Sequence, residues 1–266
     1  MVPHQFLKSA AADLIDGAGM WRMWHLIGTN EIRNRYRRST FGPFWASLSM
    51  GIQALVTAFV LGFLFKQPVD RFLPFICISL VVWNFILNTV NEGASAFIGS
   101  AELITQVKRP FTVYILQTVW RNLIVGAHTI VIFFVVAFIF GLFPDAHYLL
   151  AIPGLVLLLC NVTWMALFTA VFSARFRDVP MLVQNAFTML FWLTPVVYAP
   201  DQLGGTVAAI VRLNPLTHII EVVRAPLLLQ TGSIENWAVA FVTPLLGWAI
   251  TFLLFSRTRH RIAFWI

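Results

Sequence analysis

The sequence predicts an all-α integral membrane protein with six transmembrane helices, an N-terminal amphipathic helix at the membrane interface and a re-entrant helical hairpin before the last span. Of its 266 residues, 59% are hydrophobic and only 11% are charged, and the mean hydropathy is +0.81. Soluble domains carry roughly 25% charged residues. Several apolar runs reach the roughly 20 residues that a helix needs to cross a bilayer. The basic residues gather in alternate connections between these runs.

Six apolar runs are the expected spans, and they cover residues 43–65, 72–98, 111–143, 148–173, 181–199 and 237–255. The third run is longer than one crossing requires, so we expect part of it at the interface or outside the membrane. The fifth run is short. These spans divide the chain into an N-terminal segment (1–42), a transmembrane domain (43–255) and a C-terminal tail (256–266).

The distribution of basic residues predicts the orientation. Fourteen of the 18 Lys and Arg residues lie in the N-terminal segment, in or just beyond the connections after the second and fourth runs, and in the C-terminal tail. Basic residues concentrate in the cytoplasmic loops of membrane proteins, so both termini are expected in the cytoplasm. The same bias explains the net charge of +7 and leaves no reason to expect a nucleic-acid partner.

The segment 20–39 is too polar to cross the membrane, and its apolar residues recur at helical spacing. We expect it to form the interface helix, lying against membrane lipid. Its basic end leads directly into the first span. Guanidinium groups bind phosphate through paired hydrogen bonds, so these arginines are candidates for binding an anionic substrate headgroup; the alternative is a simple topology anchor. The candidates are Arg33, Arg35, Arg37 and Arg38.

The connection 99–110 is a candidate docking segment for a partner protein. Ser100 is expected to cap a short helix, and Pro110 to end it. One face of that helix would be apolar, and an ordinary loop is the alternative. The residues expected to contact the partner are Leu103, Ile104, Val107 and Lys108.

The stretch 201–233 is half apolar but contains many polar residues and helix breakers. Asn214 before Pro215 is typical of a helix start, and Glu221 and Arg224 can pair on one helix face. We expect two short helices that enter the outer leaflet and return, forming a gate; the alternative is a folded outer loop. The gate candidates are Asn214, Pro215, His218, Glu221 and Arg224.

Several kinds of chemistry are missing from the sequence. It contains no phosphate-binding P-loop, no zinc-protease motif and no nucleophile elbow, and only Glu92 of the acidic residues falls clearly inside a span. We therefore expect no catalytic residue, no metal site and no cofactor on this chain, and no ion-coupled transport.

Aromatic residues take the place of charge in the spans, and some of these rings are expected to line a channel. A ring offers a flat apolar face to a sugar, and Trp and Tyr add a polar group. The channel candidates are Trp45, Phe59, Phe63, Phe187, Phe191, Trp192 and Tyr198.

Three motifs in this setting carry a resemblance to a known family. They are RNRYRRSTFGPFW at 33–45, FRDVP at 176–180 and LNPLTH at 213–218. With six spans and an interface helix, the chain resembles the ABC-2 type permeases that export O-antigen, capsule or teichoic-acid polysaccharides. The resemblance implies a homodimer in the bacterial inner membrane, a separate ABC ATPase dimer that binds ATP and Mg²⁺, and a glycan substrate, often linked to polyprenyl pyrophosphate.

Three alternatives remain at this stage. The chain could belong to an ABC-2 exporter of a small molecule or lipid. It could be a membrane enzyme acting on polyprenyl-linked sugars, although it lacks the paired carboxylates or metal site that such an enzyme needs. It could also be a scaffold for a biosynthetic complex.

Overall fold

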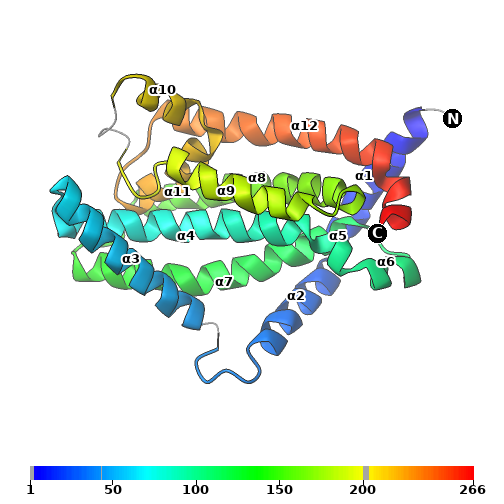
Figure 1. The fold of residues 1–266 in the computed structure, drawn as a ribbon, viewed down its shortest axis with the longest axis horizontal. Helices are drawn as coiled ribbons and strands as arrows, with labels where there is room; N and C mark the ends of the chain where they lie inside the picture. Colours follow the sequence, from blue (N-terminus) through cyan, green and yellow to red (C-terminus); the bar gives the residue numbers. More distant parts are fainter. Residues whose placement is uncertain (1–2, 43, 200–203) are drawn as a thin grey trace.

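The fold is a bundle of long helices with smaller helices at both ends (Figure 1). The computed structural model describes residues 3–42, 44–199 and 204–266, and within these ranges it contains helices and no strand. The predicted all-α fold is confirmed. The helices are α1 (Pro3–Gly19), α2 (Trp21–Arg35), α3 (Phe44–Phe65), α4 (Val69–Ala94), α5 (Ala96–Gly99), α6 (Ala101–Gln106), α7 (Thr112–Ile139), α8 (Tyr148–Arg175), α9 (Val179–Leu193), α10 (Gly205–Leu213), α11 (Pro215–Leu227) and α12 (Ile234–Trp265).

Five of these helices, α3, α4, α7, α8 and α12, are long and apolar enough to cross a membrane. The predicted start of the first span, Pro43, lies outside the described residues. The second predicted span was too long at its end, because α4 stops at Ala94 and a separate short helix follows Ser95. The excess of the third run is also explained: α7 ends at Ile139, and Gly141 adopts the left-handed conformation (φ +73°) that commonly terminates helices.

The predicted fifth span is shorter than a full crossing helix. α9 has 15 residues, which rise only about 22 Å against a hydrocarbon core of about 30 Å. Yet α8 ends, and α12 begins, at opposite ends of the bundle (Figure 1), so the chain between them must return across it. The buried segment from Thr194 to Val197 extends α9 in that direction. The crossing is therefore part helix and part irregular backbone, which a membrane tolerates where protein covers it.

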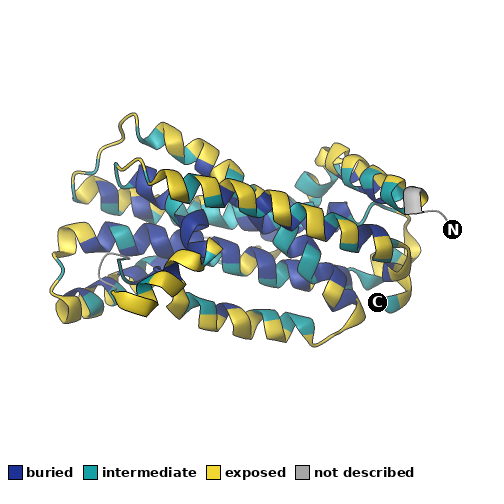
Figure 2. Cartoon of the chain, turned by 90° about the horizontal axis from the view of Figure 1, so that it is seen from above, coloured by how far each residue is buried: buried dark blue, intermediate teal, exposed yellow. Residues whose placement is uncertain are grey.

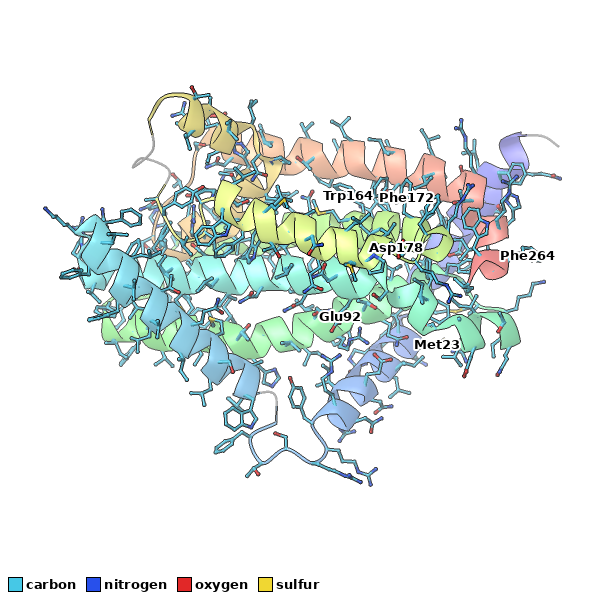
Figure 3. All side chains as sticks on the ribbon, viewed as in Figure 1. Met23, Glu92, Trp164, Phe172, Asp178 and Phe264 are labelled. Atoms are coloured by element: carbon cyan, nitrogen blue, oxygen red, sulfur yellow. The ribbon has the colours of Figure 1, made fainter. Side chains whose placement is uncertain are left out.

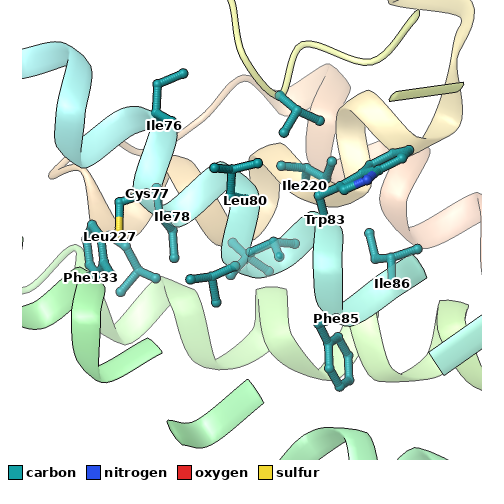
Figure 4. Packing of buried hydrophobic residues seen from close by; sticks show 14 of the residues in the cluster. Ile76, Cys77, Ile78, Leu80, Trp83, Phe85, Ile86, Phe133, Ile220 and Leu227 are labelled. Carbon is teal, nitrogen blue, oxygen red and sulfur yellow. The ribbon is translucent and has the colours of Figure 1, made fainter. Parts of the chain in front are cut away.

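α4 is the central helix, and 78% of its most apolar stretch is buried inside the protein. It packs against α3, α7, α8, α9 and α11. Figure 2 shows buried residues gathered inside the bundle and exposed residues along its outer helices. Figure 4 shows side chains of α4 meeting Phe133 of α7 and Ile220 and Leu227 of α11. This core holds α4 in place and leaves little of its surface open.

The sequence did not predict α1 or the full length of α12. α1 and the C-terminal end of α12 lie side by side at the same end of the bundle (Figure 1). The carboxylate of buried Asp13 in α1 accepts hydrogen bonds from the backbone nitrogens of Phe111 (3.1 Å) and Thr112 (3.0 Å), and from Nε of Arg259 (2.7 Å). It therefore caps α7 and joins it to α1 and α12. Residues 256–265, expected to be a tail, are the continuation of α12.

Candidate functional site

A charged cluster connects the interface helix α2 to α4 and α7. Glu92, the one carboxylate that the sequence placed inside a span, points between α4 and α7 (Figure 3). Its Oε2 accepts hydrogen bonds from Nε (3.0 Å) and Nη2 (2.8 Å) of Arg121 and from Nδ2 of Asn122 (2.8 Å). Its Oε1 lies 3.3 Å from Nη2 of Arg35 on α2. Three helices thus meet at one carboxylate.

Arg121 also forms an ion pair with Glu31 of α2. A hydrogen bond from Nε1 of Trp120 on α7 to the hydroxyl of Thr29 on α2 (3.1 Å) also joins these two helices. Gly28 allows the close approach, because a Cβ there would lie 3.0 Å from the carbonyl oxygen of Gln117. A hollow of about 290 Å³ opens beside this cluster. Two carboxylates and two guanidinium groups neutralise one another here and join α2 to α4 and α7. We call this cluster of Glu31, Arg35, Glu92 and Arg121 the joint.

The structure separates the four candidate headgroup arginines into two kinds. Arg35 is engaged in the joint through Glu92. Arg33, Arg37 and Arg38 are exposed and form no ion pair with any residue the structure describes. These three remain available for an anionic group, and their binding to a headgroup stays a prediction.

The expected docking segment contains a helix, as predicted. α6 covers Ala101–Gln106, and Ser100 occupies its N-cap position, although its side chain accepts no capping hydrogen bond. Leu103 and Val107 are exposed. Ile104 instead packs against the cluster of buried residues that includes Phe97 and Tyr114. The apolar face open to a partner is therefore smaller than expected, and Lys108 lies beside it as an exposed residue.

The candidate channel rings lie in different environments. Phe59 and Phe63 of α3 are 72% and 87% exposed, and Trp45 and Trp192 are also exposed. Phe187 is buried, with its ring centroid 5.8 Å from that of Trp83 on α4, and it can form only a wall behind other residues.

Phe191 is half-buried against Trp83, at 5.6 Å. Tyr198 donates a hydrogen bond to the carbonyl of Trp192 (3.0 Å). The candidate rings of α3 are all exposed, whereas those of α9 range from buried Phe187 to exposed Trp192. Only the exposed rings are open to a ligand.

The predicted pair of short helices is present, with α10 and α11 bent by 80° at Asn214. Residues 201–203 of the expected gate lie outside the described residues. Asn214 caps α11 by accepting from the backbone nitrogen of Leu216 (3.0 Å), and Pro215 occupies the first turn. His218 is buried between the carbonyl of Arg212 (2.7 Å) and the side chain of Asn236 (2.7 Å). These bonds fix the hairpin to α12.

Arg224, 1% exposed, anchors the same hairpin to the core. It pairs with Glu221 as predicted, through Nε at 2.9 Å. It also donates to the hydroxyl of Ser79 on α4 (2.9 Å) and to the carbonyl of Pro195 after α9 (2.6 Å). The ring of Phe75 lies 4.3 Å away. A gate at this place would move with α4 and α9, because one guanidinium joins all three segments.

Comparison with known proteins decides the family. The family model described as ABC-2 type transporter matches residues 23–228, which include the interface helix, the joint and the bent helix pair. The chain belongs to the ABC-2 type transporter family.

Two curated relatives of this ABC-2 type transporter cover much of its length. It is 22% identical over 244 residues to an O-antigen export system permease protein, RfbA, of Klebsiella pneumoniae, covering 90% of this chain and 92% of the relative. It is 28% identical over 193 residues to a protein of the same name from Myxococcus xanthus, covering 71% of this chain and 74% of the relative. The ABC-2 type transporter is thus a multi-pass membrane protein that is similar to named permeases over 71% to 90% of its length.

Sequence reasoning missed the joint of this ABC-2 type transporter. In the sequence, Arg121 is one of the basic residues just beyond the connection after the second run, and neither it nor Glu31 belongs to a motif. One signal pointed to it: an acidic residue inside a span usually has a basic partner, and Arg121 is the basic residue inside the neighbouring span. The residues that the structure describes contain no group of His, Cys, Asp and Glu that could hold a metal.

Proposed function

We propose that this chain is the permease of an exporter that moves a polysaccharide, such as an O-antigen, across the bacterial inner membrane, driven by ATP hydrolysis on a separate ABC ATPase. The observation that carries the proposal is the similarity to O-antigen export permeases over 90% of the chain. The missing P-loop agrees with it, because the chain needs a partner to bind ATP.

The exposed rings support a carbohydrate cargo. Trp45, Phe59, Phe63 and Trp192 project from helices long or apolar enough to border a membrane pathway. A homodimer would bring two such faces together around one channel. Aromatic faces bind sugars without fixed charge, and weak repeated contacts suit a sliding polymer.

Coupling to the ATPase would run through two elements at the end of the bundle where α1 and α12 meet. α6 presents Leu103 and Val107, and α2 is clamped to α4 and α7 by the joint. A push on α2 would reach two spans directly, because ion pairs and tight packing leave little slack. Arg33, Arg37 and Arg38, which form no ion pair with a described residue, would receive a pyrophosphate headgroup.

The experiment compares surface polysaccharide in cells lacking the chain with cells that regain it. Loss on deletion and recovery with the wild type are expected, together with glycan retained inside the deletion strain. Normal surface polysaccharide without the chain would refute the proposal, and loss of a small-molecule or lipid export instead would favour the alternative cargo.

The headgroup site needs its own variant. Arg37→Ala with Arg38→Ala should leave membrane insertion intact and reduce export about tenfold or more, because charge-assisted hydrogen bonds to phosphate are lost. The matched control, Arg257→Ala with Arg261→Ala, removes two exposed charges from the end of α12 and should export normally. Equal export by both variants would remove the headgroup assignment.

A further inference from the structure

The half of α4 nearest α5 leaves one narrow stripe open, and that stripe is polar. Between Val81 and Ala94, the residues that are not buried are Asn84, Leu87, Asn88, Asn91 and Glu92. Glu92 belongs to the joint. The three asparagines are separated by four and three positions, so they lie on one face of the helix.

The stripe does not serve the fold. Other amides in this chain do: Asn122 donates to Glu92, Asn161 to the carbonyl of Ala240, and Asn214 to Thr194. Asn84, Asn88 and Asn91 make no side-chain hydrogen bond within the described part of the chain, and Oδ1 of Asn91 is buried without a donor. Asn88 is exposed and Asn84 is half-buried, so their unsatisfied amides point to a partner outside the protomer.

Lipid is not that partner, because hydrocarbon offers amides no hydrogen bond. A helix of a second copy is disfavoured by position: α4 is the most buried of the long helices, and α3 and α9 pack on it. A second helix, about 10 Å across, would have to fit against the narrow stripe that the neighbouring helices leave open on α4. A solvated ligand meets no such obstacle.

α9 adds polar groups at the same level. Gln184 and Thr188 are exposed and share a helix face with Phe191, which contacts Trp83 of α4. α9 runs opposite to α4 (Figure 1). Gln184 lies two turns before Phe191 on α9, and Asn88 and Asn91 lie about two turns after Trp83 on α4. Because the two helices run in opposite directions, Gln184 is at the level of Asn88 and Asn91.

We infer that Asn84, Asn88 and Asn91 of α4, with Gln184 of α9, form a hydrogen-bonding track for the hydroxyl groups of a glycan in transit. The inference rests on the proposed function. An amide both donates and accepts, as a sugar hydroxyl does, and it carries no charge to hold the polymer in place. Weak contacts repeated along a helix let a chain slide, while Phe191, half-buried against the buried ring of Trp83, marks where ring surface begins.

The test is cysteine labelling in a background without Cys77 and Cys160. Asn88→Cys is compared with Leu246→Cys, an exposed apolar position on α12. Membranes with the complete transporter are treated with a membrane-impermeant methanethiosulfonate reagent, once from cells that make the polysaccharide and once from cells lacking its first glycosyltransferase. We expect no labelling of Leu246→Cys, and rapid labelling of Asn88→Cys only where glycan is absent.

Three results would overturn the track. If Asn88→Cys is not labelled in either membrane, residue 88 faces lipid or protein. A disulfide between two copies through Asn88→Cys makes the stripe a dimer contact. Labelling that is equal with and without glycan shows an aqueous face that no glycan covers. If deletion of the chain still abolishes surface polysaccharide, each result removes the track and leaves the proposed function standing.

A second measurement separates hydrogen bonding from space. The triple change of Asn84, Asn88 and Asn91 to Leu keeps similar volume and removes every amide. Export should fall about tenfold or more, since each hydrogen bond contributes about 0.5–1.5 kcal/mol. Changing the same three residues to Gln should retain much of it. Equal export by the Leu and Gln variants would overturn the inference.

Discussion

Replacing Glu92 with Gln keeps the shape of the side chain and removes the charge on which α2, α4 and α7 converge. The side chains of Glu92 and Arg121 are 29% and 15% exposed. An exposed ion pair contributes about 0–1 kcal/mol, and breaking a buried one costs about 3–5 kcal/mol. This partly buried pair, with two hydrogen bonds from one guanidinium, lies between these limits, at about 2–3 kcal/mol.

Thermal unfolding of the detergent-solubilised chain measures this cost. In a chain of this size, 1 kcal/mol corresponds to about 2–4 °C in Tm, so Glu92→Gln should lower Tm by roughly 4–12 °C. Glu102→Gln on α6 is the matched control, because Glu102 is exposed and forms no ion pair with a described residue. It should leave Tm unchanged.

A double-mutant cycle decides whether the pair itself causes the effect. Glu92→Gln combined with Arg121→Gln should destabilise by less than the sum of the single changes, because both remove the same interaction. Strict additivity, or a Tm for Glu92→Gln equal to that of Glu102→Gln, would refute the assignment of this cluster as the joint.

Two further predictions concern the anchoring of the hairpin. Arg224→Met should destabilise by about 3–5 kcal/mol, because it removes a buried guanidinium that bonds to Ser79 and Pro195 and leaves partly buried Glu221 without its partner. Arg212→Met, at an exposed residue of α10, is the control, and equal melting curves would contradict the anchor. Gly154→Ala should cost about 1–3 kcal/mol by forcing α8 from α11, since its Cβ would lie 2.2 Å from the carbonyl oxygen of Val222. Gly99→Ala, with nothing within 4 Å, should melt as the wild type does.

The sequence predicted the long spans because apolar runs of membrane length have one stable outcome in lipid. It also predicted the break at Asn214, where a capping side chain and a proline act through neighbouring backbone atoms. The boundary errors have local causes as well: Gly141 ended α7 earlier than the apolar run did, and no Gly or Pro lies between Phe255 and Trp265 to end α12 at the predicted boundary.

Side-chain roles in the candidate site were less predictable. Arg33, Arg35, Arg37 and Arg38 look equivalent in the sequence, yet only Arg35 reaches a carboxylate. Phe187 and Trp192 belong to the same short run, but one is buried against Trp83 and the other is exposed. Which face of a helix meets a neighbour depends on packing against other helices. A span that is apolar on all sides has no pattern from which that face can be predicted.

The sequence by itself determined that this chain resides in the membrane, where its five long apolar helices lie and where polar segments interrupt them. These properties follow from local composition, because lipid requires each span to satisfy its own backbone. Only the tertiary structure decided that Glu31, Arg35, Glu92 and Arg121 meet, that Arg224 joins α11 to α4, and that the asparagines of α4 stay open. Such contacts join residues far apart in the chain, and their partners are set by how the helices pack, which no local pattern encodes.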